Sequence, residues 1–288
     1  MDTRIRSLGK IAFKVSISLV ALYIVFQKID SKKLLAILAS ANPVWLLIAL
    51  ATYGGSKILS SFRLTLYLRA NGVSLPESEN LRLYFIGMFY NLFLPGGIGG
   101  DGYKVWLLQK NFSVSTKMIF QSVLFDRLNG MVMLGLLGVI FALSAFPSWS
   151  GYIVLGGIAL VSIPLFYFLH RMFARTLLGV FTSTTLFSIG VQGLQIVCAC
   201  VILKALGIVD LVPAYISIFL LSSLVAVLPI SIGGIGIREL VFITAAGFSP
   251  ISRDASVAFS MLLFVVTAIC SLPGGFIPVP AFKNAEKN

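Results

Sequence analysis

Six apolar runs, each a candidate for a membrane-crossing helix, constrain the fold of this chain more than any other feature. They cover residues 11–26, 43–66, 118–146, 149–169, 178–203 and 255–278. A helix rises about 1.5 Å per residue, so about 20 apolar residues cross the roughly 30 Å hydrocarbon core of a bilayer. Because 58% of the residues are hydrophobic and only 11% are charged, the composition excludes a soluble domain. The sequence predicts one all-α integral membrane domain over residues 1–280, followed by a short tail at 281–288.

The chain is also strongly basic, with a formal net charge of +12. Most of the cations lie near the ends of apolar runs and form no solvated basic domain, so nucleic acid is not an expected partner. Their distribution follows the positive-inside rule for a multi-pass protein of the cytoplasmic membrane with both termini cytoplasmic. The three cysteines lie inside apolar runs without nearby histidines, and no nucleotide-binding loop or zinc spacing occurs. No cofactor and no metal are therefore expected.

One short stretch occurs twice. The sequence LPGGIGGDGYKVWLL at residues 94–108 matches LPISIGGIGIRELVF at residues 228–242 at a constant offset (229 − 95 = 134). The offset aligns the Leu-Pro start, an Ile and three glycines, and it places Lys104 opposite Arg238. Each copy interrupts an apolar run with Pro and Gly and sets a cation just beyond the break. This is the pattern of a duplicated site in a membrane protein.

The apolar arms before the two breaks are too short to cross a membrane. Residues 81–94 and 213–228 reach only about 21 to 24 Å as helices, which predicts two re-entrant hairpins in addition to the six full spans. Hairpins that re-emerge where they entered also give the charge distribution that the positive-inside rule favours. Three full spans separate them, so one hairpin opens to the cytoplasm and the other to the outside. The sequence thus predicts an inverted-topology repeat, with repeat one at 43–146 and repeat two at 178–280.

The two breaks predict an anion site near the middle of the membrane. A helix that starts inside a membrane has unpaired backbone N–H groups and a positive dipole end, and glycine lets an anion approach the backbone closely. Lys104 and Arg238 would add full positive charges. The alternative is that the glycines serve only close helix packing or act as hinges.

Other polar residues inside the apolar runs are costly there unless they are paired or hydrated. Arg63 shares a helix face with Ser56, Ser60 and Tyr67, and this stripe is expected to face the bundle interior. Asp126 shares a face with Ser122 and Asn129, whereas Arg127 points about 100° away, so the two need separate partners. Ser188, Gln192 and Gln195 form a similar stripe.

Five further polar residues are interpreted from their positions in the sequence. Asp101 and Glu239, beside the two cations, are interpreted as ion-pair partners, proton carriers or rim groups. The alternative for all these charged residues is that they neutralise one another to hold helices together. Lys57 and Lys204 are interpreted as snorkelling or packing residues, and His170 as a residue of the membrane interface.

Three motifs in order, PGGIGGDGYK, LFDRLNG and GGIGIRE, resemble the flippase-like family, also known as the lysylphosphatidylglycerol synthase transmembrane region. The resemblance covers nearly the whole chain and comes without the soluble aminoacyltransferase domain of some members. The site residues that the resemblance and the polar stripes single out are Gly96, Gly97, Gly99, Gly100, Asp101, Lys104, Arg63, Asp126, Arg127, Gly233, Gly234, Gly236, Arg238 and Glu239.

The resemblance implies translocation of an anionic lipid or a polyprenyl-phosphate-linked intermediate across the cytoplasmic membrane, without catalysis. The expected ligand is therefore a membrane lipid with an anionic headgroup. Two alternatives stay open. One is an intramembrane transferase that uses Asp126 or Glu239 as a base, and the other is a structural subunit of a lipid or envelope biosynthesis complex. Association with a second copy or with a lipid-biosynthesis partner is likewise left open.

Overall fold

The chain is an all-α membrane protein. The computed structural model describes residues 19, 23–25, 27–28, 30–93, 99–145, 149–227, 234–280 and 282, and within these ranges the regular structure is helical. The described elements are α2 (Ser31–Ala39), α3 (Pro43–Ala70), α4 (Glu77–Phe93), α5 (Gly99–Asn111), α6 (Thr116–Ala145), α7 (Trp149–Phe173), η1 (Arg175–Val180), α8 (Phe181–Ala205), α9 (Val212–Val227), α10 (Ile237–Ala246), α11 (Arg253–Ser271) and η2 (Leu272–Gly275).

Five helices of the described chain are long and apolar enough to cross a membrane, and they match five of the six predicted spans. They are α3, α6, α7, α8 with η1, and α11 with η2. Their boundaries follow local signals: Asn42 accepts a hydrogen bond from the N–H of Val44 at the start of α3, and Pro43 occupies the first turn. Pro273 similarly stands in the short helix that follows α11. The sixth predicted span, residues 11–26, lies mostly outside the described residues.

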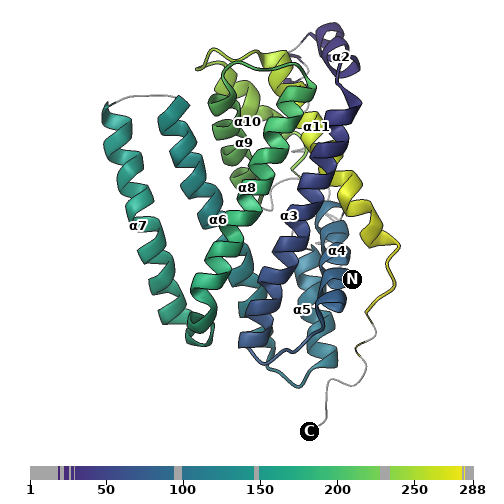
Figure 1. Ribbon diagram of the computed structural model, residues 1–288, viewed down its shortest axis with the longest axis vertical. Helices are drawn as coiled ribbons and strands as arrows, with labels where there is room; N and C mark the ends of the chain where they lie inside the picture. Colours follow the sequence, from purple (N-terminus) through teal and green to yellow (C-terminus); the bar gives the residue numbers. More distant parts are fainter. Residues whose placement is uncertain are drawn as a thin grey trace, which may run out of the picture.

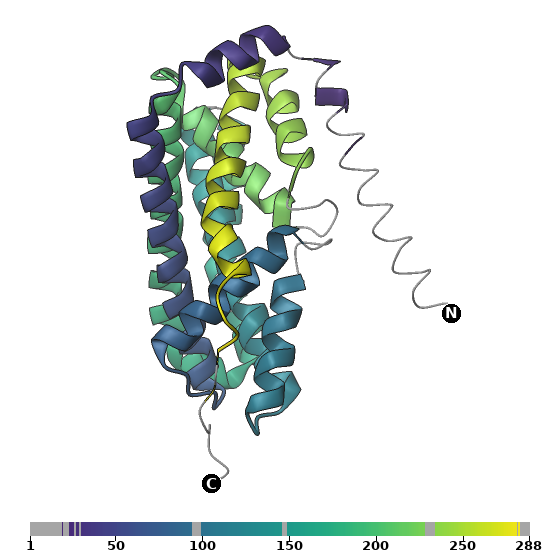
Figure 2. The same cartoon turned by 90° about the vertical axis from the view of Figure 1, so that its right-hand side faces the viewer.

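The two predicted hairpin arms are half-length helices at opposite ends of the molecule. In Figure 1, α4 and α5 lie beside the lower half of α3, whereas α9 and α10 lie in the upper half, and Figure 2 shows the same division from the side. At about 1.5 Å per residue, the 17 residues of α4 and the 16 of α9 reach roughly 25 Å, less than the hydrocarbon core. The order α3–α4–α5–α6 is thus followed, upside down, by α8–α9–α10–α11.

Packing between elements has the same duplicated plan. Helix α5 packs on α4 and α6, and α10 packs on α9 and α11. Across the two halves, α6 packs on α9, and α11 with η2 packs on α4. The short connection η2 approaches α4 so closely that a Cβ on Gly274 would overlap the carbonyl oxygen of Phe85. Each hairpin is therefore held by the last helix of the other half, as an interlocked repeat requires. Helix α7 belongs to neither half and packs on α6 and η1.

Helices α3 and α8 pack antiparallel and cross closely through one glycine of each. A Cβ on Gly55 would lie 3.8 Å from a methyl of Leu194, and a Cβ on Gly190 would lie 2.8 Å from a methyl of Leu59. The full correspondence of repeats 43–146 and 178–280 stays a prediction.

Candidate functional site

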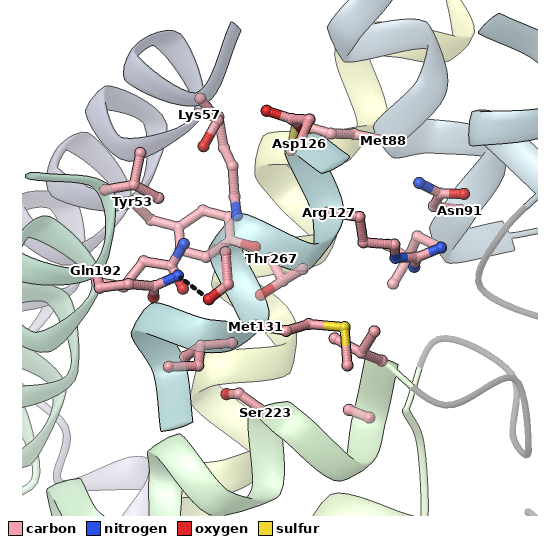
Figure 3. Close-up of a pocket in the computed structure, with 18 of the residues that line it drawn as sticks. Tyr53, Lys57, Met88, Asn91, Asp126, Arg127, Met131, Gln192, Ser223 and Thr267 are labelled. Atoms are coloured by element: carbon pink, nitrogen blue, oxygen red, sulfur yellow. Dashed lines mark hydrogen bonds between the residues drawn. The ribbon is translucent and has the colours of Figure 1, made fainter. Parts of the chain in front are cut away.

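A polar cavity lies where the two halves meet. Its volume is about 280 Å³, and its lining comes from α3, α4, α5, α6, α8, α9, α10 and α11. In Figure 3, Tyr53, Lys57 and Gln192 lie on one side of the cavity, and Asn91 and Arg127 lie on the other. Six of the predicted site residues line it: Arg63, Asp101, Lys104, Asp126, Arg127 and Arg238. The fold thus collects six side chains from four helices, which the sequence separates by as many as 175 positions (238 − 63).

Arg63 and Asp126 form the most buried ion pair of the cavity. The Arg63 Nε donates to Asp126 Oδ1 at 2.7 Å, and these residues are only 4% and 7% exposed. The Arg63 guanidinium also donates to Ser188 Oγ at 2.7 Å, which ties α3 to α8. Arg and carboxylate together offset much of the cost of burying either one, and loss of one partner would leave an uncompensated charge. This pair therefore couples the cavity wall to the stability of the bundle.

Asp101 holds the second group of charges. Its Oδ2 accepts from Arg127 at 2.8 Å, and its Oδ1 accepts from Lys104 at 3.3 Å and from the Asn91 amide at 3.4 Å. The prediction that Asp126 and Arg127 need separate partners is confirmed, because Asp126 binds Arg63 on α3 and Arg127 binds Asp101 on α5. The Lys104 ammonium also stands 4.4 Å from the centre of the Tyr84 ring. One carboxylate of the first hairpin thus positions two cations, Lys104 on α5 and Arg127 on α6.

Two cavity cations, Lys57 and Arg238, have no carboxylate within 4.0 Å among the described residues. The Lys57 ammonium lies 4.4 Å from the centre of the Tyr53 ring, and the buried Nε of Arg238 makes no hydrogen bond within the described chain. The lining therefore holds five cations and two carboxylates, and both carboxylates are already paired. A charge inside a membrane costs about 2.5–3.5 kcal/mol or more unless it is compensated. The cavity is accordingly suited to an anion.

Two of the repeated glycines, Gly100 and Gly236, make contacts within the protein, and Gly100 fits the alternative of close helix packing. A Cβ on Gly100 would overlap the carbonyl of Gly87, so this glycine permits close packing of α5 on α4. Its N–H donates to Asn91 Oδ1 at 2.8 Å, and the N–H of Gly236 donates to Glu239 Oε2 at 2.8 Å. Both helix starts are thus capped by side chains of the protein, and these N–H groups are not available to a ligand.

Gly234 and Gly236 also have φ angles of +83° and +82°, a region that other residues rarely adopt, so the second turn needs glycine for its backbone alone. Of the other predicted glycines, Gly99 lies in α5 without lining the cavity. Gly96, Gly97 and Gly233 lie outside the described residues. A ligand-binding role for these three stays a prediction.

Glu239 acts within the protein. Besides capping α10, it accepts a hydrogen bond from Ser260 Oγ at 2.8 Å, it is only 5% exposed, and it does not line the cavity. It therefore joins α10 to α11. Asn129 likewise belongs to a structural network and donates to the hydroxyl of Tyr67 at 2.7 Å.

Lys57, Lys204 and His170 lie in different surroundings. Lys57 packs over the Tyr53 ring, in line with its packing interpretation, and it also lines the cavity beside Tyr53 and Ser60, residues four and three positions away. Residues at these spacings share one face of a helix, and this pattern was the sequence signal that Lys57 belongs with the polar residues of the cavity. His170, in the last turn of α7, is fully buried and makes edge-to-face contacts with the rings of Phe125 and Phe166 at 4.5 and 4.4 Å, so its surroundings are protein side chains. Lys204, as expected, packs over the ring of Trp45 at 4.0 Å.

Comparison with known proteins agrees with the resemblance seen in the motifs. The family model described as the lysylphosphatidylglycerol synthase TM region matches residues 11–274, which confirms the resemblance and indicates a membrane protein related to lipid handling. No curated protein sequence matches the chain significantly. In the described part of the chain, no cluster of His, Cys, Asp and Glu has the composition of a metal site.

Proposed function

We propose that this chain, which belongs to the family of lysylphosphatidylglycerol synthase transmembrane regions, moves an anionic lipid between the two leaflets of a membrane. The observation that supports this most is the cavity between the two halves. It lies within a bundle of membrane-crossing helices and carries more cations than carboxylates. A buried cationic cavity compensates an anionic headgroup while the headgroup is away from water.

Headgroup binding is assigned to the two cations that have no carboxylate partner. Arg238 comes from the second hairpin and Lys57 from α3, so a phosphate between them contacts both halves of the protein. Lys104 and Arg127, which share Asp101, complete the cationic wall. Charge-assisted hydrogen bonds from Arg and Lys are the strongest that a phosphate oxygen receives from protein side chains. The acyl or prenyl tail stays in the bilayer during transfer.

Movement is assigned to a change in the relative position of the two halves. Hairpins that enter from opposite ends meet at the cavity, and rocking of one half against the other exposes such a site alternately to the two sides of a membrane. The reciprocal glycine contacts between α3 and α8 provide a close, apolar crossing about which the halves can rotate. The acidic residues Asp101 and Asp126 hold the cationic wall in place throughout.

The test is lipid translocation by purified protein in vesicles. Fluorescent acyl-labelled phosphatidic acid is incorporated in both leaflets, and dithionite, which does not cross the membrane, bleaches the outer leaflet. Vesicles with the protein should lose nearly all fluorescence, whereas protein-free vesicles should lose about half. The double variant Lys57→Gln, Arg238→Gln should translocate at least about 10-fold more slowly, because each lost contact to a charged group contributes about 1.5 kcal/mol or more.

Lys204→Gln is the matched control, because Lys204 packs over Trp45 and lies outside the cavity. Melting temperatures in detergent show whether each variant is folded. Equal translocation by the folded double variant and the wild type would overturn the proposal. A covalently altered lipid in the same vesicles would favour a transferase instead, and the absence of both effects would favour a structural subunit.

A further inference from the structure

We infer that the cavity selects a lipid headgroup with at least two negative charges, such as a phosphomonoester or a diphosphate, over a singly charged phosphodiester or a cationic lysyl ester. This inference rests on the proposed function, since it names the substrate class of the same site. It comes from the balance of charges in the cavity and from which of those charges are already paired.

The charges in the cavity do not cancel. The lining carries Lys57, Arg63, Lys104, Arg127 and Arg238 against Asp101 and Asp126, a formal excess of three positive charges. Arg63 is matched by Asp126 at 2.7 Å, and Asp101 is shared by Lys104 and Arg127. A phosphodiester would leave two of the three excess charges uncompensated inside the bundle. A dianion or a diphosphate compensates two or more of them.

The same balance argues against a lysyl ester headgroup. Such a headgroup carries two ammonium groups and one phosphate, so it is a net cation. An ammonium needs a carboxylate or several carbonyl oxygens in a low-dielectric site. Both carboxylates of the lining are already bound to cations of the protein, and Glu239 is turned away to cap α10. The cavity therefore repels this headgroup, although the family is described by lysylphosphatidylglycerol.

The position of the unpaired cations also fits a small, highly charged group. Lys57 and Arg238 line the same cavity from opposite halves. Two like charges held together without a counter-ion are most stabilised by a ligand that neutralises both at once. The cavity volume of about 280 Å³ equals that of roughly nine water molecules in the liquid, which is room for a phosphate or a diphosphate.

Equilibrium binding in detergent tests this selectivity without requiring transport. The full chain is titrated with phosphatidic acid, geranylgeranyl phosphate, phosphatidylglycerol and lysylphosphatidylglycerol, and bound lipid is measured by native mass spectrometry. The two phosphomonoesters should bind at least about 10-fold more tightly than phosphatidylglycerol, with the lysyl lipid weakest. Comparison of the two phosphomonoesters identifies whether the preferred tail is diacylglycerol or prenyl. Tight binding of either one supports the preference for a headgroup with at least two negative charges.

The double variant Lys57→Gln, Arg238→Gln lowers the formal excess from three charges to one, so the preference for a phosphomonoester should shrink to about two-fold or less. Lys204→Gln should keep the wild-type preference. Equal or tighter binding of phosphatidylglycerol or the lysyl lipid by the wild type would overturn the inference. Selective binding without translocation would contradict the proposed function but support the selectivity. Translocation of all four lipids at one rate would support the proposed function but contradict the selectivity.

Discussion

The two halves of this molecule share a backbone plan and differ in their charges. The first half contributes four of the five cavity cations and both carboxylates, and the second contributes Arg238 alone. Where α3 carries Lys57 and Ser60, α8 carries Gln192 and Gln195, and all four residues line the cavity. The cavity therefore has one charged wall, held by ion pairs, and one neutral polar wall with a single cation that has no carboxylate partner.

The difference extends to the last helix of each half. The offset of 134 found in the motifs pairs Asp126 on α6 with Ser260 on α11 (126 + 134 = 260). Asp126 neutralises a buried arginine, whereas Ser260 donates to the buried carboxylate of Glu239. The first half thus uses its acids to hold cations at the cavity, and the second uses its acid to hold a helix start. The two paired positions have different roles, one electrostatic and the other structural.

The largest expected effect comes from breaking the Arg63–Asp126 pair. Asp126→Ala leaves Arg63 buried without a counter-charge, and we expect a loss of about 3–5 kcal/mol in the free energy of unfolding. Ser260→Ala, at the paired position, should cost only about 1–2 kcal/mol because it removes one hydrogen bond to a carboxylate that keeps its other partner. Unfolding in mixed micelles measures both. Equal losses would contradict the division of roles.

The glycine of the first hairpin gives the next largest effect. Gly100→Ala should destabilise the protein by about 1–3 kcal/mol, because its Cβ would overlap the Gly87 carbonyl and push α5 from α4. Gly102→Ala, in the same helix, has nothing within 4 Å of the added Cβ and should change stability by less than about 0.5 kcal/mol. If Gly100→Ala melts like the wild type yet loses lipid binding, the glycine contacts ligand after all.

A smaller and opposite effect is expected from Asp101→Asn. This change removes a carboxylate from the charged wall and raises the formal excess of the cavity from three positive charges to four, so binding of phosphatidic acid should tighten by about 3-fold to 10-fold. Glu239→Gln, which keeps an acceptor for the Gly236 N–H outside the cavity, should leave lipid affinity within about two-fold. Native mass spectrometry of lipid titrations separates the two. Weaker binding by Asp101→Asn would show that Asp101 itself contacts the lipid.

The smallest effect is predicted for Lys204→Ala. Its ammonium packs over Trp45, a contact that contributes about 0.5–1 kcal/mol at an exposed site, and it lies outside the cavity. Melting temperature should fall slightly and translocation should be unchanged. A large loss of translocation would extend the functional surface beyond the cavity.

The fold followed from the sequence where length and composition decide it. Apolar runs of the right length predicted five described spans, and the short arms before the two breaks predicted the half-length helices α4 and α9. Within a bilayer, the backbone N–H and C=O groups must form hydrogen bonds inside the protein, so an apolar run of this length has few alternatives to a helix. The odd number of spans between the two breaks predicts hairpins that open to opposite sides of the membrane, and this topology stays a prediction.

The partners of the charged side chains could not be read in the same way. Arg127 binds an acid on α5, 26 positions earlier, and only the packing of the helices selects that partner. The sequence favours snorkelling or packing for Lys57, and its place in the cavity wall depends on how α3 faces the other helices. The capping of Gly100 by Asn91 likewise joins two helices across a hairpin whose geometry the sequence leaves open.

Access to the cavity from both sides of the membrane tests the central claim most directly. Ser223, on α9, lines the cavity and is suited to a single reporter cysteine after replacement of Cys198, Cys200 and Cys270 by alanine. In oriented vesicles, an impermeant maleimide should label Ser223→Cys from the inside and from the outside, and phosphatidic acid should slow both reactions. Labelling from one side alone would contradict translocation through this cavity, and so would labelling rates that are the same with and without phosphatidic acid.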